Sequence, residues 1–324
     1  MKKTFLIVGD NHLDSKTPVS RIDNYMETGL MELKETLDIA QAANVDYYIL
    51  LGDVFNRIEV GGECRNRALE TLCSNNGIPW GFEKYVIVGN HDIAHNFHNL
   101  DKSALQTLIS AGALKCEDEI PGLPVRFLHF KSDLDYQLQK GELCNHLDDI
   151  IFLHGSIVDK PAIFDHILFS ELKFRQATKL IISGHIHSPM MAYNKETDTR
   201  FINPGSLGRP EISEKHKPQV LLLQYDFENS SYLYKFLQLK NSLPHDVIFD
   251  IDKNTKSKHE NKSTKMFIET ITNMSVSANT TGNIENDFRE FAKNKNVEKD
   301  VIKEAIETIQ TIKLGVNNWI IQTN

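Results

Sequence analysis

The chain has 324 residues and a formal net charge of −8, with 40% hydrophobic and 25% charged residues, which is the composition of an ordinary globular protein. This length suffices for one large domain with an appendage, and the acidic balance argues against a surface covered in basic side chains. No apolar run approaches the roughly 20 residues of a membrane helix, and Phe5–Val8 is too short for a signal peptide. Four cysteines without paired spacing favour a reducing compartment, so a cytoplasmic location and no membrane association are expected.

The first part of the chain alternates predicted strands and helices. Apolar positions three to four residues apart predict a helix over residues 22–43, between strands that end at Val8 and Leu51. This arrangement predicts a βαβ unit. The elements that follow in chain order are helices over Arg65–Asn76 and Leu100–Ala111, strands over Val125–Phe130 and Ile150–Leu153, a helix over Pro161–Phe174 and a strand over Lys179–Ser183.

Short strands replace this alternation in the next part of the chain. They are predicted over Met190–Tyr193, Arg200–Ile202, Val220–Tyr225 and Tyr232–Leu239, joined by turns such as Asp226–Ser231. These strands predict a second, more antiparallel sheet. The expected fold is therefore an α/β four-layer αββα sandwich over residues 1–241.

The C-terminal part of the chain has a different composition. Residues 242–283 are rich in Asn, Lys, Ser and Thr and are interpreted as a flexible linker, although its lysines could also form a DNA-contacting strip. Residues 284–324 regain helical periodicity, with apolar stripes that a small helical segment cannot bury by itself. They are predicted to form a helical appendage that either packs on the main domain or docks onto a partner helix.

Polar signatures follow five apolar, β-branched runs, at the point where each predicted strand ends. They are Asp10-Asn11-His12, Gly52-Asp53, Gly89-Asn90-His91-Asp92, His154-Gly155 and Gly184-His185-Ile186-His187. Because ligands bind at the carboxyl ends of strands in layered α/β proteins, we expect all five loops to meet at one face.

The residue types suit a pair of divalent cations. Two such ions roughly 3.5–4 Å apart can clamp the oxygens of a phosphoryl transfer and provide a hydroxide near neutral pH. The candidate metal ligands are Asp10, His12, Asp53, Asn90, His154, His185 and His187. Asp53 stands alone after its strand and is the natural bridge. His91 is left as the candidate general acid, with Asp92 fixing its tautomer and orientation.

Each signature alone has an ordinary structural explanation, such as a turn, a helix cap or a solvated strand end. Ordinary turns, caps and strand ends do not explain five such signatures at five strand ends. The remaining histidines lack such a context, although His95 and His98 follow His91 closely enough to line the same cleft.

The five signatures resemble the motifs of the calcineurin-like metallophosphoesterase superfamily, over roughly residues 4–240. Within it, the chain is most similar to the nuclease subunit of SbcCD-type DNA break-repair complexes, especially the phage-type versions. The segments that carry this narrower resemblance are GDNHLDSKTPVSRIDNY, LLGDVFNR, VIVGNHD, SGHIHSP and FINPGSLGRPE.

The resemblance implies a DNA exonuclease and endonuclease of DNA repair and recombination that generally works with manganese. One ion would take Asp10, His12, Asp53 and His187, and the other Asp53, Asn90, His154 and His185, with His91 as the catalytic histidine. It also implies that the C-terminal segment grips an SbcC-like coiled-coil ABC ATPase. The acidic body fits this picture, since DNA binding would then need a local basic rim, the groove of a homodimer or the partner.

Two other functions stay open at this level. A stand-alone phosphodiesterase or phosphatase acting on nucleotides or other small phosphoesters would have no evident need for the C-terminal extension. A non-catalytic binding subunit would have no need for the complete set of candidate ligands and His91.

Overall fold

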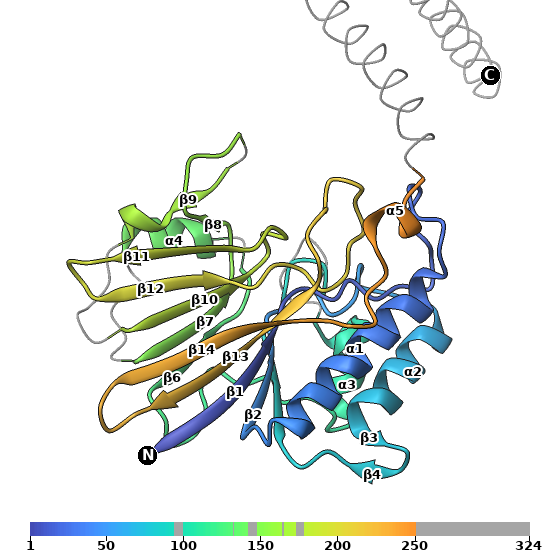
Figure 1. The fold of residues 1–324 in the computed structure, drawn as a ribbon, viewed down its shortest axis with the longest axis horizontal. Coiled ribbons are helices and arrows are strands. Elements are labelled where there is room, and N and C mark those ends of the chain that lie inside the picture. The colour runs from blue at the N-terminus through green and yellow to red at the C-terminus, as the bar shows by residue number, and fades with distance from the viewer. Residues whose placement is uncertain (94–99, 132, 142–147, 164, 173–177, 251–324) are drawn as a thin grey trace, which may run out of the picture. The chain divides into compact units, whose positions relative to one another are not determined.

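In the computed structural model, two five-stranded β-sheets pack face to face (Figure 1). The structure describes residues 1–93, 100–131, 133–141, 148–163, 165–172 and 178–250. They belong to one unit, Met1–Asp250. Within the described residues, no helix has both the length and the apolar character that crossing a membrane requires.

The first sheet has the strand order β14-β13-β1-β2-β5. Its strands are β1 (Lys2–Val8), β2 (Tyr47–Leu50), β5 (Glu83–Val86), β13 (Gln219–Asp226) and β14 (Ser231–Gln238). The strands β1, β2 and β5 are parallel, and helix α1 (Tyr25–Ala42) connects β1 to β2. The predicted βαβ unit is confirmed.

The second sheet has the order β11-β12-β10-β7-β6. Its strands are β6 (Val125–Leu128), β7 (Ile150–His154), β10 (Leu180–Gly184), β11 (Met190–Asn194) and β12 (Thr199–Asn203). All neighbouring strands are parallel except the pair β11 and β12. The carboxyl ends of the parallel strands therefore lie at one edge of this sheet, as they do in the first sheet.

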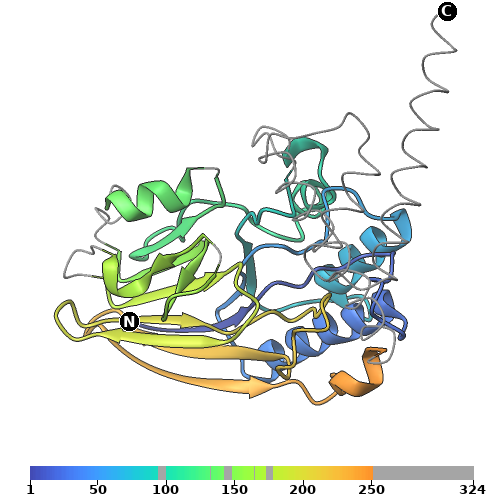
Figure 2. The same cartoon turned by 90° about the horizontal axis from the view of Figure 1, so that it is seen from above.

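Apolar side chains fill three separate regions of the core. Between the sheets, Phe5 and Ile49 of the first sheet share a cluster with Phe152 and Ile182 of the second. The outer face of the first sheet is covered by α1, α2 (Gly62–Cys73) and α3 (Ala104–Ser110), which follows the 3₁₀ turn η1 (Leu100–Lys102). The outer face of the second sheet is covered by α4 (Leu134–Lys140) and the 3₁₀ turn η3 (Phe169–Glu171). Figure 2 shows α4, in green, on the face of the second sheet that is turned away from the first sheet. The predicted four-layer αββα sandwich is confirmed.

Two short strand pairs and one short helix complete the elements. The strands β3 (Ser74–Asn75) and β4 (Ile78–Pro79) form a small hairpin after α2. The strands β8 (Ile157–Val158) and β9 (Ile167–Leu168) pair in parallel beside the second sheet. Helix α5 (His245–Ile248) is the last described element.

The prediction that the four late strands build the second sheet is wrong. The β11–β12 pair joins the second sheet, but the β13–β14 hairpin returns to the first sheet and pairs with β1. The reason lies in β13, where Val220 packs against the helices while Leu221 and Leu223 pack between the sheets. A strand that is apolar on both faces is stable only where both faces are covered.

The predicted helix over Pro161–Phe174 is also wrong within its described residues. There the chain forms β9 and η3 instead. Ile167 and Leu172 are buried, whereas Ile163 of the same apolar stripe is fully exposed. Pairing of β9 with β8 therefore overrides the local helical pattern.

The predicted domain boundary at residue 241 comes too early, because residues 242–250 belong to the folded unit. Ile248 and Phe249 are buried, and Phe249 pairs with Arg21 in an isolated bridge. The Asp250 N–H donates to the Ser20 carbonyl at 3.1 Å. The rest of the predicted linker and the helical segment 284–324 lie outside the described residues.

Replacing Phe249 with Ala tests this extension of the domain. The ring is buried against the Arg21 guanidinium (5.3 Å) and the His245 ring (4.8 Å), so its loss leaves a cavity. We expect Phe249→Ala to lower the free energy of unfolding by about 3–5 kcal/mol, measured by urea denaturation. Val247→Ala, at an exposed neighbouring position, should change it by less than about 0.5 kcal/mol. Equal effects of the two substitutions would mean that residues 242–250 are a linker after all.

Candidate metal centre

The loops after β1, β2, β5, β7 and β10 bring the predicted site residues together. Asp10, His12, Asp53 and His154 are almost completely buried, whereas His187 is partly exposed. The full set that meets at this edge of the two sheets is Asp10, His12, Asp53, Asn90, His91, His154, His185 and His187.

The first group of potential ligands contains Asp10, His12 and His187. Their ligand atoms lie within 4.8 Å of one another. The Nε2 atoms of His12 and His187 are 2.8 Å apart, and His187 Nε2 is 3.8 Å from Asp10 Oδ2. Three side chains from two different sheets therefore point at one small volume.

The second group contains Asp53, His154 and His185, again with ligand atoms within 4.8 Å of one another. Asn90 belongs with them, since its Oδ1 lies 2.8 Å from His185 Nδ1 and 2.9 Å from His154 Nε2. An amide oxygen, a carboxylate and two imidazoles thus converge on a second volume.

Asp53 lies between the two groups. Its Oδ2 is 3.8 Å from His12 Nε2 in the first group and 3.4 Å from His154 Nε2 in the second. Its Oδ1 accepts a hydrogen bond from the His91 backbone N–H at 2.8 Å. This is the position that a bridging carboxylate requires.

The two groups fit a pair of divalent cations by their own chemistry. Asp10 Oδ1 and His12 Nδ1 are buried without a hydrogen-bond partner, which is costly for polar atoms. Carboxylate and amide oxygens with imidazole nitrogens suit Mn²⁺, Fe²⁺ or Zn²⁺. A cation held by Asp10 would offset the cost of burying its carboxylate, whereas His12 Nδ1 faces away from the group and gains no partner from it.

The backbone of three potential ligands is in the left-handed region. The φ angles are 49° at His12, 46° at Asp53 and 78° at His185, where a residue with a Cβ costs about 1–3 kcal/mol. The Asp53 carbonyl stabilises two of these loops by accepting from the N–H groups of Asn11 (3.1 Å) and His12 (2.9 Å). The loops are thus held in a strained form that aims the side chains inward.

Two motif glycines leave room for carboxylates. A Cβ at Gly89 would lie 2.1 Å from Asp53 Oδ1, and a Cβ at Gly184 would lie 2.5 Å from Asp10 Oδ1. Any side chain at either position would displace a potential ligand. Gly89 and Gly184 are therefore needed for space, since neither has a positive φ, unlike Gly52 with its φ of 104°.

The orientation of three histidines is set by acceptors outside the signatures. Nδ1 of His154 donates to the Leu51 carbonyl at 2.8 Å, and Nδ1 of His91 donates to the Asn56 carbonyl at 2.7 Å. Nδ1 of His187 donates to the Glu214 carboxylate. Each Nε2 is thereby left without a proton in the neutral ring. The sequence offered no signal for these partners, because backbone carbonyls are common to all residues and Glu214 lies in no recognisable motif.

The prediction that Asp92 orients His91 is wrong. Asp92 is buried and accepts from the backbone N–H groups of Gly89 (3.0 Å) and Phe55 (3.3 Å), so it fastens the loop after β5 to the loop after β2. The Asn56 carbonyl fixes the His91 ring instead. His95 and His98 lie outside the described residues.

Burial and neighbouring charges shift the pKa values of the ionisable side chains in the site. Burial acts to raise the pKa of Asp53, but His154 and His12 outweigh it and hold that pKa well below its usual range. Burial disfavours a charged His154, yet Asp53 and Asp10 raise its pKa to about 10. Burial likewise opposes a charged His187, but Glu214 and Asp10 raise its pKa to about 9. Without cations, both imidazoles are therefore protonated at neutral pH.

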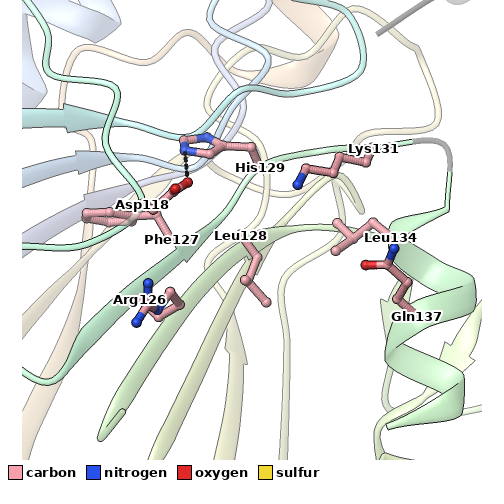
Figure 3. Close-up of a pocket in the computed structure, with 8 residues that line it drawn as sticks. All are labelled: Asp118, Arg126, Phe127, Leu128, His129, Lys131, Leu134 and Gln137. Atoms are coloured by element: carbon pink, nitrogen blue, oxygen red, sulfur yellow. Dashed lines mark ion pairs between the residues drawn. The ribbon is translucent and has the colours of Figure 1, made fainter. Parts of the chain in front are cut away.

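A separate pocket of about 180 Å³ opens between β6 and α4 (Figure 3). His129 and Asp118 form an ion pair at 3.6 Å on one side, and Lys131 and Gln137 lie on the other. None of the eight converging residues lines this pocket. The chemistry is therefore assigned to the strand-end loops.

The calcineurin-like phosphoesterase family model matches residues 3–201. No curated protein matches the chain. Similar solved structures are a dimetal phosphatase from Danio rerio (12% identity, TM-score 0.42, 72% of this chain and 98% of that chain), the protein TT1561 of Thermus thermophilus (11%, 0.40, 72% and 99%) and the phosphoesterase Yfce from E. coli (12%, 0.34, 73% and 100%).

Replacing Asp53 with Asn tests the bridging role. Because the amide is neutral and therefore a much weaker ligand for a divalent cation than a carboxylate, Asp53→Asn should bind at most one ion per chain where the unchanged protein binds two. Elemental analysis after dialysis against excess Mn²⁺ and gel filtration measures this ratio. Asp38→Asn, on the exposed face of α1, is the matched control and should keep two ions. Two ions and unchanged activity in Asp53→Asn would contradict the assignment.

The pH dependence of cation binding follows from the two raised pKa values. His154 and His187 carry protons in the cation-free state and must lose them to act as ligands, so binding releases protons and acid favours the cation-free state. We expect the affinity for Mn²⁺ to rise with pH through the neutral range. Titration calorimetry in two buffers of different ionisation enthalpy measures the released protons, and a buffer-independent heat would contradict this expectation.

Proposed function

The chain belongs to the calcineurin-like phosphoesterase family and is a metal-dependent phosphoester hydrolase, and from this premise we propose that it is a two-metal nuclease that cleaves phosphodiester bonds of DNA. The single observation that carries the two-metal part is the pair of ligand groups on either side of Asp53. We propose Mn²⁺ as the working metal.

Each group has a distinct set of side chains to hold its ion. Asp10, His12 and His187 would hold one, Asn90, His154 and His185 would hold the other, and Asp53 would touch both. When bound, the two ions supply Lewis-acid stabilisation of the phosphate charge and an activated water. The protein's contribution is a rigid and buried arrangement of these ligands.

We propose that His91 transfers a proton rather than holding an ion, although its ring also lies within ligand distance of His12 and Asp53. Its ring stands edge-on to the His12 ring with 4.8 Å between centroids, and Nδ1 is engaged by the Asn56 carbonyl. Its backbone N–H donates to Asp53 Oδ1, and a nitrogen of its ring lies within 4.8 Å of ligand atoms of His12 and Asp53. The Nε2 atom is thus free to give a proton to the leaving oxygen when the ring is protonated.

Two features support an extended phosphodiester as the substrate. The first is the sequence resemblance to the nuclease subunit of SbcCD-type complexes. The second is Arg57, which follows Asn56, lies 39% exposed and is held by the buried carboxylate of Asp14. Asp14 also accepts from Asn56 Nδ2 at 3.3 Å, so this arginine is fixed beside the loop that orients His91. A fixed guanidinium next to the reaction site suits a neighbouring phosphate of a polynucleotide.

We also propose an ABC-type coiled-coil ATPase, SbcC-like, as the partner that docks on residues 284–324. The support is the apolar helical stripes of that segment and the acidic character of residues 1–252, which alone would bind DNA weakly. Co-purification of such an ATPase with the full chain, but not with a chain that ends at Asp250, tests the proposal. Equal co-purification with both would contradict it.

The class of substrate is tested by comparing rates on DNA with rates on small phosphoesters. The full chain with Mn²⁺ is assayed on end-labelled duplex and single-stranded DNA, on nucleoside monophosphates and on bis-p-nitrophenyl phosphate, with Asp53→Asn protein as the blank. We expect cleavage of DNA with a higher kcat/KM than for any small ester. Hydrolysis confined to the small esters would instead make the protein a stand-alone phosphodiesterase or phosphatase.

Replacing His91 with Ala tests its role as general acid. The variant should keep two ions, because its ring holds neither, and should lower kcat on DNA by about 10²–10⁴. On bis-p-nitrophenyl phosphate the loss should be much smaller, because nitrophenolate leaves without a proton. Metal content and the two rates are measured on the same preparation. An equal loss on both substrates together with a lost ion would make His91 a ligand.

A further inference from the structure

Glu214 is a buried carboxylate directly behind the metal centre. It belongs to neither ligand group, yet it is only 7% exposed and its Oε1 accepts the Nδ1–H of His187. We propose that Glu214 is a positioning residue that fixes the orientation and tautomer of His187 and so sets the affinity of the Asp10, His12 and His187 group for its cation. This inference rests on the two-ion part of the proposed function and not on the choice of DNA as substrate.

The tautomer argument follows from what each atom can do. A neutral imidazole has one N–H, and a carboxylate can only accept. With the proton on Nδ1 toward Glu214, His187 Nε2 presents its lone pair to the volume it shares with His12 Nε2, 2.8 Å away, and Asp10 Oδ2, 3.8 Å away. The other tautomer would point a proton at that volume.

His187 needs such a partner more than the other histidines do. The side chain of His154 is 0% exposed and that of His12 is 1% exposed, so packing confines both rings, whereas that of His187 is 24% exposed. His187 also lies three positions beyond the end of β10, farther from the sheet than His185. A charged acceptor supplies the confinement that packing does not, and it makes the ring a stronger donor to a cation.

Both oxygens of Glu214 are engaged. While Oε1 accepts from His187, Oε2 accepts from the Glu211 backbone N–H at 2.8 Å. An amide in the same place could accept at one oxygen only, so Gln would lose one of the two hydrogen bonds or turn its NH₂ toward His187. The site is therefore specific for a carboxylate.

The loop that carries Glu214 is itself fastened to the end of the folded unit. Arg209 is buried and donates to the Leu243 carbonyl at 2.7 Å, and the His245 ring donates to the Ile212 carbonyl at 2.8 Å. These bonds tie the loop to Leu243 and His245 near the end of the folded unit. Glu214 is thus preorganised, which is what a positioning role requires.

The test compares Glu214→Ala and Glu214→Gln with Glu211→Gln, which changes an exposed carboxylate of the same loop and keeps its backbone N–H. Each full-length variant is titrated with Mn²⁺ by calorimetry, and the spin-coupled signal of a Mn²⁺ pair is followed by electron paramagnetic resonance. Both Glu214 variants should bind one ion about 10–100-fold more weakly and lose the coupled signal at limiting Mn²⁺, with the other ion unaffected. Glu211→Gln should match the unchanged protein.

Other outcomes overturn the inference. Unchanged affinity for both ions in Glu214→Ala would contradict it. An equal loss of both ions together with a lowered melting temperature of the cation-free protein would also contradict it, since that pattern indicates a general structural role. Where the Ala variant fails to fold, the isosteric Gln variant decides by the same criteria. If the unchanged protein binds fewer than two ions, the proposed two-metal function fails instead.

Discussion

The candidate metal centre depends on one buried carboxylate that two sets of polar side chains share. Asp53 lies 3.8 Å from a His12 nitrogen and 3.4 Å from a His154 nitrogen, although these histidines come from different sheets. That arrangement is achieved only if both sheets end their parallel strands at the same edge. The parallel strands β1, β2 and β5 of one sheet and β7 and β10 of the other satisfy this condition.

Concentrating these charges inside the protein is unfavourable in the absence of cations. Burial raises the pKa of Asp10 to about 6, and three of the site residues occupy left-handed backbone conformations. The loops persist because hydrogen bonds from several directions over-determine them, including those that Asp53 and Asp92 accept from backbone N–H groups. Such a site is expected to gain stability on binding cations, since the bound state offsets the buried carboxylate charge and removes the repulsion between protonated histidines.

Much of the fold and most of the site residues could be predicted because the signals are local. An apolar run that ends in Gly-Asp or Gly-His needs only its own sequence to be recognised as a buried strand that delivers a polar loop. The sheet to which β13 belongs could not be predicted, because it depends on which distant surface covers its second apolar face. The same holds for β9, where pairing with β8 overrides helical spacing, and for Phe249, whose burial depends on Arg21.

The roles of individual site residues likewise divide into those that the sequence predicts and those that it does not. The types and spacing of the potential ligands point to their chemistry, but the groups that orient them come from elsewhere in the chain. The sequence suggested Asp92 as the partner of His91 because the two are adjacent, whereas the structure gives that role to the Asn56 carbonyl. Glu214 could not be found, since 27 positions separate it from His187.

The central claim is that two cations share Asp53, and diffraction from crystals grown with Mn²⁺ tests it most directly. Anomalous difference maps recorded on the manganese edge should contain two peaks roughly 3.5–4 Å apart, one beside Asp10, His12 and His187 and the other beside Asn90, His154 and His185. Both peaks should be in contact with the Asp53 carboxylate. A single peak, or two peaks of which only one contacts Asp53, would contradict the account.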